Sequence, residues 1–380
     1  METLKKYPVR IAINTRFLLS DRPLEGLGWY TYEVCRELVR QHPEDEFFFL
    51  FDRPYDERFV FGENVTPIVI GPQARHPAAW LWWFEVSVAR ALEQHRIDVF
   101  FSPDNYVSLR SRVPTLVTCH DLAYEHFPEQ VPLLARYYYP FFFPRYLRRA
   151  EAVVTISEYT RKDLLQRYEL DPKKVTVAPN GTRRFYPLTG LAVQQFRQFH
   201  TKGEPYFFYV GAIQPRKNIA RLIRAFDAFK RSGSSTRLVI GGRWAWQTED
   251  VQTALNESPY RADILLPGFI SDRDLPQWLG AARAFVYPSL FEGFGLPVLE
   301  AMSAGVPVLT SSVSSLPEVA GDAALLVDPR DTDAIAAGLS RLDSDATLRH
   351  TLSERGNTRH QKFTWAETAA LIYRELNRIA

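Results

Sequence analysis

Short apolar runs alternate along the chain with longer segments whose apolar residues recur every three to four positions. Residues 9–13 form one such run, and residues 28–42 after it place Tyr30, Val34 and Leu38 on one helical face. Apolar strands joined by amphipathic helices are typical of a parallel sheet that is covered on both faces. The pattern therefore predicts an α/β fold.

The alternation occurs twice. The first series of expected strands is 9–13, 47–51, 67–70, 98–101, 115–119, 153–156 and 175–178. Asn180-Gly181 is a turn signal, and residues 182–204 lack a clear period. The second series is 206–210, 238–240, 264–266, 284–287, 306–310 and 324–327. We therefore expect two doubly wound halves, whose ligands bind where the strands end at their carboxyl edge.

Composition excludes several classes of protein. With 46% hydrophobic and 24% charged residues, the chain of 380 residues can bury a large core, and its net charge of +2 gives no reason to expect nucleic-acid binding. Cys35 and Cys119 cannot form a disulfide framework or a zinc site alone. The first ten residues lack the apolar segment of a signal peptide, and no apolar run reaches the roughly 18 residues of a membrane span. We expect a cytoplasmic protein.

The strongest candidate site is the segment 291–302, which follows an expected strand. Gly293 and Gly295 let the backbone approach a ligand, and Pro297 suits the first turn of a helix. The free N–H groups at that helix start would form a site for a diphosphate. They belong to Phe294, Gly295 and Leu296. Glu292 and Glu300 could accept hydrogen bonds from sugar and ribose hydroxyls. The alternative is a glycine-rich turn that caps a core helix.

A second candidate lies after the strand 206–210. Gly211 begins a loop that carries Arg216 and Lys217, and two adjacent cations there could neutralise a departing diphosphate without a metal ion. The alternative is a pair of solvated cations, with Asn218 as the N-cap of the next helix.

Two weaker candidates lie in the first half. His120, with Asp121 beside it, ends the strand 115–119 and could bond a sugar hydroxyl, although a lone histidine is as often structural. The segment 25–29 carries Gly28 but lies far from the preceding strand and lacks a third glycine, so it does not fit a dinucleotide-binding turn. A flexible loop on the acceptor side fits it better.

Taken together, these segments resemble glycosyltransferase family 4, whose members are retaining enzymes of the GT-B fold. The resemblance covers nearly the whole chain, and its combination of motifs is specific although no single motif is. The matching segments are 26–28, 120–122, 155–160, 178–181, 209–211, 215–218, 267–270, 292–300 and 363–365.

The resemblance implies two Rossmann-like domains that face each other across a cleft. Residues 1–185 would form an acceptor-binding domain and residues 186–363 a domain that binds a nucleotide sugar. Residues 364–380 would form a helix that crosses back to the first domain, with Trp365 and Ile372 on its apolar stripe.

The resemblance also implies a role for each site residue. Arg216 and Lys217 would hold the diphosphate, Glu292 the transferred sugar, and His120 would reach that sugar from the first domain. Glu300 would bind the ribose. The remaining donor-binding residues would be Gly28 and Gly211 near the diphosphate, Gly268, Phe269 and Ile270 at the base, and Gly293, Phe294, Gly295 and Leu296 at phosphate and sugar.

The implied reaction transfers a glycosyl group with retention of its anomeric configuration. We find no obvious carboxylate nucleophile and assign Glu292 to binding and electrostatics. Three Asp-x-Asp tripeptides, at 272–274, 331–333 and 343–345, lie where aspartate commonly caps helices. We therefore expect neither a metal ion nor a cofactor, the nucleotide sugar being a substrate.

The sequence narrows the identity of the sugar-nucleotide donor but does not decide it. Asp272 follows the expected base pocket, and a carboxylate accepts well from the adjacent N1–H and N2–H of guanine. This favours GDP-mannose, and the segment 215–218 also resembles bacterial mannosyltransferases of the family. UDP- and dTDP-sugars stay open. A nucleotide-sugar 2-epimerase of the same fold is a rival that would need no acceptor, and a non-catalytic sugar-nucleotide-binding protein is another.

Two aromatic clusters, at 79–84 and 136–149, lie on the acceptor side. They could form a basic, aromatic surface for a lipid-linked acceptor at the inner membrane face. We favour the alternative, buried helices with arginines reaching outward, because aromatic stripes usually belong to a core. Pro140 and Pro144 argue against one long regular helix. The acceptor is expected to be a glycan, free or lipid-linked.

Overall fold

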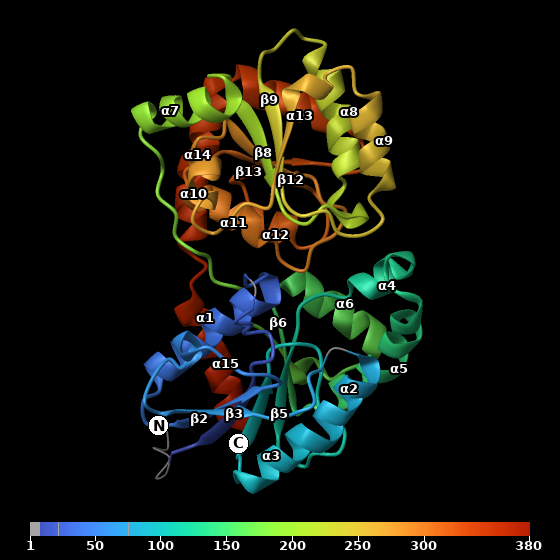
Figure 1. Ribbon diagram of the computed structural model, residues 1–380, viewed down its shortest axis with the longest axis vertical. Helices are drawn as coiled ribbons and strands as arrows, with labels where there is room; N and C mark the ends of the chain where they lie inside the picture. The colour runs from blue at the N-terminus through green and yellow to red at the C-terminus, as the bar shows by residue number, and fades with distance from the viewer. Residues whose placement is uncertain (1–7, 22, 75) are drawn as a thin grey trace. The chain divides into compact units, whose positions relative to one another are not determined.

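The computed structural model describes residues 8–21, 23–74 and 76–380 (Figure 1). The chain divides into two compact units. The first comprises Met1–Gly181 with Thr364–Ala380, and the second comprises Thr182–Phe363. The division thus falls at Gly181 rather than at 185, and the last helix belongs to the first unit.

The first unit contains a seven-stranded parallel sheet of order β3-β2-β1-β4-β5-β6-β7. Its strands are β1 (Arg10–Asn14), β2 (Glu46–Phe51), β3 (Val65–Val69), β4 (Val99–Ser102), β5 (Thr115–Cys119), β6 (Ala152–Thr155) and β7 (Val175–Val177). Its helices are α1 (Gly26–Gln41), α2 (Pro77–Trp82), α3 (Ala89–Gln94), α4 (Ala123–His126), α5 (Leu133–Arg149), α6 (Glu158–Tyr168) and α15 (Trp365–Ile379). A π-helical segment, Trp83–Val88, joins α2 to α3.

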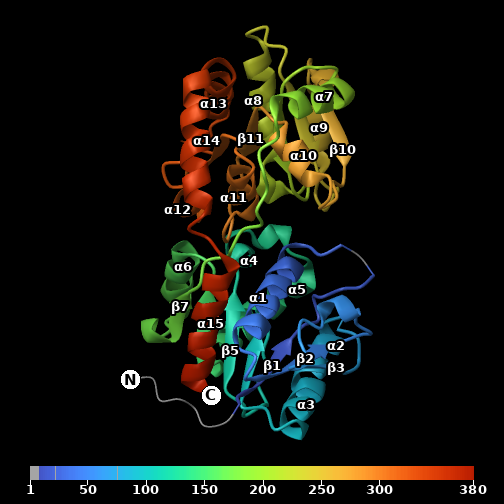
Figure 2. The same cartoon turned by 90° about the vertical axis from the view of Figure 1, so that its left-hand side faces the viewer.

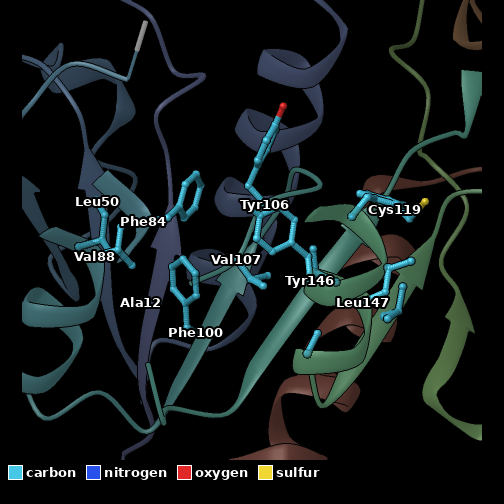
Figure 3. Packing of buried hydrophobic residues seen from close by; sticks show 14 of the residues in the cluster. Ala12, Leu50, Phe84, Val88, Phe100, Tyr106, Val107, Cys119, Tyr146 and Leu147 are labelled. Atoms are coloured by element: carbon cyan, nitrogen blue, oxygen red, sulfur yellow. The ribbon is translucent and has the colours of Figure 1, made fainter. Parts of the chain in front are cut away.

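Helices cover both faces of this sheet. On one face α1 and α15 lie side by side (Figures 1 and 2). On the other face the π-helical segment, α3, α5 and α6 bury aromatic and aliphatic side chains against the strands (Figure 3). Phe84 and Tyr106 stack there with ring centroids 5.8 Å apart, and Phe100 of β4 is fully buried. Burial on both faces explains why the strands read as continuous apolar runs.

The second unit repeats this architecture with a six-stranded parallel sheet of order β10-β9-β8-β11-β12-β13. Its strands are β8 (Tyr206–Val210), β9 (Arg237–Gly241), β10 (Ile264–Gly268), β11 (Ala284–Tyr287), β12 (Val308–Ser311) and β13 (Ala324–Val327). Its helices are α7 (Gly190–Thr201), α8 (Ile219–Lys230), α9 (Glu249–Glu257), α10 (Leu275–Gly280), α11 (Leu296–Ser303), α12 (Leu316–Ala320), α13 (Thr332–Ser344) and α14 (Ala346–His360).

Each sheet has one point where the strand order reverses direction. In the first sheet it lies between β1 and β4, and in the second between β8 and β11. Neighbouring loops at such a point leave opposite faces of the sheet and open a crevice at the carboxyl ends of the strands. The two Rossmann-like sheets confirm the predicted GT-B fold, and these two crevices are where ligand-binding residues should gather.

Three local predictions were wrong. Gly26–Gly28 lie in the first turn of α1 rather than in a flexible loop, and a Cβ at Gly28 would stand 3.0 Å from the carbonyl oxygen of Phe17. Glycine at position 28 therefore allows the helix to pack closely against the backbone of Phe17, and it does not make the segment mobile. The stretch without a clear period contains the helix α7, in which Thr201 is the sole buried residue.

The third wrong prediction concerns α5, which runs as one helix through Pro140 and Pro144. The two prolines remove the donors to the carbonyl groups of Arg136 and Pro140, and both of those residues are exposed, so water can take the place of the missing donors. No helix in the described parts of the chain combines the length and apolar character that a bilayer crossing requires.

Candidate functional site

The predicted helix start after β11 is confirmed. Leu296 begins α11 with Pro297 in the first turn, and Gly295 occupies the N-cap with φ of +110°. A Cβ at Gly295 would stand 2.7 Å from Cδ2 of Leu316, so both the dihedral angle and the space require glycine. Within the described residues, the backbone N–H groups of Phe294, Gly295 and Leu296 have no protein acceptor. The turn therefore presents donors suited to an anion.

The loop after β8 contacts this turn directly. Lys217 Nζ donates to Glu292 Oε1 at 2.6 Å and to the hydroxyl of Tyr287 at 2.7 Å. Arg216 Nη1 donates to the carbonyl oxygen of Phe291 at 3.2 Å. The two motifs that the sequence separates by some 75 positions thus form one cluster at the crevice between β8 and β11.

Glu292 is ionised within this cluster. Burial alone would raise its pKa, but the charges of Lys217 and Arg216, with hydrogen bonds from Lys217 and Ser289, hold the pKa below its usual value. Ser289 Oγ donates to Glu292 Oε1 at 2.6 Å. A carboxylate held by these donors is a poor nucleophile, which agrees with a role in binding and electrostatics.

Hydroxyl side chains that the sequence analysis missed, together with the amide of Asn218, hold the backbone of both loops. Ser315 Oγ donates to the carbonyl oxygens of Glu292 and Phe294, both at 2.9 Å. Asn218 does stand at the N-cap of α8, but its side chain makes no cap bond. Instead its Nδ2 donates to the carbonyl oxygen of Pro288 at 3.0 Å. In the sequence, the polar run 311–315 was the feature that could have indicated these side-chain hydrogen bonds to the loop backbone.

Glu300 and Asp272 share a partner that the sequence did not suggest. Arg183 Nε and Nη2 lie 2.8 and 2.6 Å from Glu300 Oε1, and Nη1 lies 2.5 Å from Asp272 Oδ1. Burial, with Asp272 adding to it, raises the pKa of Glu300 despite the opposing effect of Arg183. Arg183 lies in the stretch without a clear period, where no motif marked it. Any ribose or base bound here would meet this triad rather than two isolated carboxylates.

The expected base-pocket residues lie at the end of β10 and directly after it. Gly268 ends the strand with φ of +80°, Phe269 has 58% of its surface exposed, and Ile270 packs against the backbone of Gly241. Gly211 lies directly after β8 and donates its N–H to the carbonyl oxygen of Gly241, the last residue of β9, at 3.0 Å. Their contact with a donor stays a prediction.

His120 lies in the first unit, directly after β5. Its Nε2 is 2.7 Å from the carbonyl oxygen of Pro103, which can only accept, so Nε2 carries the proton. Burial lowers the pKa of His120 more than the neighbouring acceptor and carboxylates raise it. A neutral imidazole of this tautomer leaves Nδ1 able to accept from a hydroxyl. The proposed contacts of His120 and Gly28 with a donor stay predictions.

The Asp-x-Asp pairs have mixed roles. Asp331 and Asp345 cap α13 and α14 as predicted. Asp272, Asp274 and Asp343 do not cap helices through their side chains: Asp272 pairs with Arg183, Asp274 Oδ2 accepts from Ser271, and Asp343 accepts from Ser234 and Thr236. In the described residues, potential metal ligands come together only at His42, Glu44 and Asp45 in the first unit.

Two family models match complementary parts of the chain. "Glycosyltransferase Family 4" matches residues 24–183, and "Glycosyl transferases group 1" matches residues 193–359. The chain belongs to glycosyltransferase family 4. The two matches coincide closely with the two structural units, and they establish this family-4 protein as a glycosyltransferase.

A curated relative agrees with this assignment, and solved structures share the fold. O-antigen chain mannosyltransferase B of Escherichia coli is 29% identical over 366 residues, which cover 90% of this chain and 93% of that protein. Sucrose-phosphate synthase of Thermosynechococcus elongatus matches with a TM-score of 0.79 at 20% identity, covering 99% of this chain and all of that one. Anabaena HepE in complex with UDP-glucose matches with a TM-score of 0.75 at 16% identity, covering 97% of this chain and 99% of that one.

Proposed function

We propose that this family-4 glycosyltransferase moves mannose from GDP-mannose to a glycan or lipid-linked glycan, with retention of configuration and without a metal ion. The observation that carries the proposal is the cluster of Arg216, Lys217 and the free N–H groups around Gly295. That cluster has the charge and geometry for a diphosphate leaving group.

In this reaction the bond between the anomeric carbon and the diphosphate oxygen breaks while negative charge accumulates on the diphosphate. Arg216, Lys217 and the N–H groups at the start of α11 stabilise that charge. The acceptor oxygen attacks the same face of the sugar, and its proton passes to the departing phosphate oxygen. Glu292, which is tied to Lys217 and Ser289, supports the positive sugar electrostatically without forming a covalent bond.

Two side chains support transfer without a metal ion. Arg216 and Lys217 place two positive charges beside Glu292 at the end of one loop, and the backbone N–H groups at the start of α11 add further donors for a diphosphate. The Asp-x-Asp pairs, which hold a metal in other glycosyltransferases, have structural partners in this chain.

The identity of the donor is supported by two observations. The relative from Escherichia coli is a mannosyltransferase. Asp272 lies after the base-pocket segment with Oδ1 on Arg183, and guanine would share this carboxylate through its N1–H and N2–H groups. A UDP-sugar is the second candidate, because the structurally similar HepE was solved with UDP-glucose.

Thermal unfolding with GDP, UDP and dTDP, in buffer containing EDTA, tests the donor. GDP at about one hundred times its dissociation constant should raise the melting temperature by about 5 °C through mass action. UDP and dTDP should raise it less at equal concentration. A larger shift with UDP would replace GDP-mannose by a UDP-sugar, and a shift that requires added Mg²⁺ would contradict metal independence.

We also propose that α5 rests on an anionic membrane surface. The sequence favoured a buried helix, and Phe143, Tyr146 and Leu147 are indeed buried. The opposite face, however, exposes large apolar side chains. They are Leu133, Leu134, Tyr137 and Phe141, with 66%, 74%, 74% and 52% of their surfaces exposed. The same helix carries four arginines and no acidic residue, so its charge complements anionic lipid headgroups.

Replacing three residues of this face, as L134S/Y137S/F141S, should abolish binding to the membrane while sparing transfer to a soluble acceptor. Co-sedimentation with vesicles that contain about 30% phosphatidylglycerol measures the binding, since single-helix contacts of this kind depend on both apolar area and charge. Phe199→Ser removes a ring that is 84% exposed on α7 and is the matched control, with binding unchanged. Equal sedimentation of all three proteins would contradict the membrane contact.

A further inference from the structure

One arginine joins the two acidic side chains that are expected to contact the nucleoside. Arg183 lies at the start of the second unit, before α7. Its Nε and Nη2 lie 2.8 and 2.6 Å from Oε1 of Glu300 on α11, and its Nη1 lies 2.5 Å from Oδ1 of Asp272. One edge of the guanidinium therefore holds Glu300, and another edge holds Asp272.

The backbone around Arg183 is attached to the same helix. Ser303 follows Glu300 on α11 and has only 3% of its surface exposed. Its Oγ accepts from the N–H of Phe185 at 3.2 Å and lies 3.2 Å from the carbonyl oxygen of Arg183. The guanidinium also lies over the ring of Phe185, 5.4 Å from its centroid. Main-chain and ring contacts thus hold the arginine in place in addition to its two ion pairs.

Each carboxylate keeps one oxygen for a ligand. Arg183 occupies Oε1 of Glu300 and Oδ1 of Asp272, and no described residue donates to Oε2 of Glu300 or Oδ2 of Asp272. The side chain of Asp272 is 43% exposed, and that of Glu300 is 9% exposed. Both second oxygens can therefore accept from hydroxyl or N–H groups of a ligand while the ion pairs persist.

The guanidinium also reduces the negative charge that a nucleotide would meet. Burial raises the pKa of Glu300, Arg183 opposes that effect, and Asp272 adds to it. Without the guanidinium, two carboxylates would repel each other and an anionic ligand. With it, both can stay ionised, and an ionised carboxylate is the stronger acceptor for a hydroxyl group.

A planar guanidinium sets the separation of the groups that it bridges. A nucleoside has a set separation as well, because its glycosidic bond joins the base directly to the ribose. Glu300 is expected at the ribose and Asp272 at the base, where a carboxylate can accept from N1–H of guanine or from N3–H of uracil. One rigid arginine can therefore hold both acceptors at the separation that a nucleoside requires.

We propose that Arg183 is a positioning residue that couples recognition of the ribose by Glu300 to recognition of the base by Asp272. It acts through the two carboxylates and not by contact with the ligand. This inference rests on the proposed function in so far as the ligand is a nucleoside diphosphate, but it does not depend on which base the ligand carries. The alternative is an arginine that only neutralises two acidic groups of the folded protein.

The ribose contact is measured by the dissociation constant of a deoxynucleotide divided by that of its ribonucleotide, which we call the ribose ratio. Contributions of the base and the diphosphate cancel in this ratio. Calorimetry supplies it for GDP with 2′-deoxy-GDP and 3′-deoxy-GDP, and for the corresponding uridine nucleotides. In the unaltered protein, at least one ribose ratio should be about ten, the effect of losing one hydrogen bond to a charged group. Ratios without any such loss would overturn the proposal.

Arg183→Lys keeps a positive charge beside Glu300 but cannot hold both carboxylates through two edges. The loss of affinity for the deoxynucleotide should almost disappear in this variant, while its melting temperature stays close to that of the unaltered protein. Arg184→Lys changes the exposed next residue, and this matched control should keep the full ribose ratio. A full ratio in Arg183→Lys would mean that the arginine only neutralises charge, which would contradict the proposal.

Asp272→Asn tests the coupling from the other carboxylate, whose exposure means that folding is not at risk. Although Asp272 is expected at the base, its replacement should lower the ribose ratio, because Arg183 loses one of its two anchors. The double variant R183K/D272N should have the same ratio as either single variant, since each change breaks one shared linkage. Asp274→Asn, in the same loop, is the control. An undiminished ratio in Asp272→Asn would show that ribose and base are recognised independently.

The outcomes separate this inference from the choice of donor. If both variants lose the ribose ratio but only the uridine nucleotides bind, the coupling stands and GDP-mannose fails as the donor. If GDP binds and its ribose ratio survives both substitutions, the proposed donor stands and the coupling fails. If neither series binds, the nucleotide-sugar function fails and this inference fails with it.

Discussion

Lys217→Met should lower kcat by about 100- to 1,000-fold, the loss that follows removal of one charge-stabilising donor from an active site. The side chain of Lys217 is 11% exposed, and its Nζ lies 2.6 Å from Oε1 of Glu292, whose side chain is 9% exposed. The substitution therefore also leaves a buried carboxylate without its nearest cation, and the free energy of unfolding should fall by about 3 kcal/mol. Steady-state transfer assays and chemical denaturation measure the two effects.

The double variant K217M/E292Q separates catalysis from stability. A neutral glutamine beside methionine removes the uncompensated charge, so most of the lost stability should return. Transfer should stay low, because neither the ammonium nor the carboxylate is present. Recovery of transfer together with stability would mean that Lys217 acts only in folding, which would contradict its role toward the diphosphate.

Gly295→Ala should lower transfer by about 100-fold, because a displacement near 1 Å of the groups that position a substrate has an effect of that size. Alanine at φ of +110° is strained, and its Cβ would stand 2.7 Å from Leu316. The turn must shift, and it moves the N–H groups at the start of α11 with it. The affinity for the nucleoside diphosphate, measured by calorimetry, should fall in parallel.

Gly190→Ala is the control for this substitution. Gly190 begins α7, a Cβ there would meet open space, and no positive φ is involved. Its free energy of unfolding should change by less than about 0.5 kcal/mol, as for ordinary surface substitutions. If Gly295→Ala binds the nucleotide as tightly as Gly190→Ala does, the helix start takes no part in phosphate binding.

The sequence predicted the sheets well because their strands are buried on both faces and therefore carry a continuous apolar signal. The helix start at Leu296 was predictable for a related reason, since Gly295 and Pro297 encode the local backbone directly. Features with such local chemistry can be read from neighbouring residues alone.

Features that depend on distant partners could not be read in this way. Arg183 is one guanidinium in a segment without periodicity, and its role emerges only when Glu300 and Asp272 are brought to it. Likewise, Arg16 and Asp104 pair across 88 positions of sequence. The burial of α5 was predicted only in part for another reason. Its aromatic residues cover two faces of the helix, of which one packs in the core and the other is exposed.

The proposed diphosphate site lies at the crevice beside the reversal of strand order in the second sheet. The second unit places cations and backbone donors there, which suits a diphosphate. The loops supply this chemistry, while the strands supply the position.

A crystal structure of the protein with its donor nucleoside diphosphate is the most direct test. The β-phosphate oxygens should lie within hydrogen-bonding distance of the N–H groups of Gly295 or Leu296 and of the side chain of Arg216 or Lys217. A diphosphate bound elsewhere, with these groups still turned to Glu292 and Phe291, would contradict the proposed site.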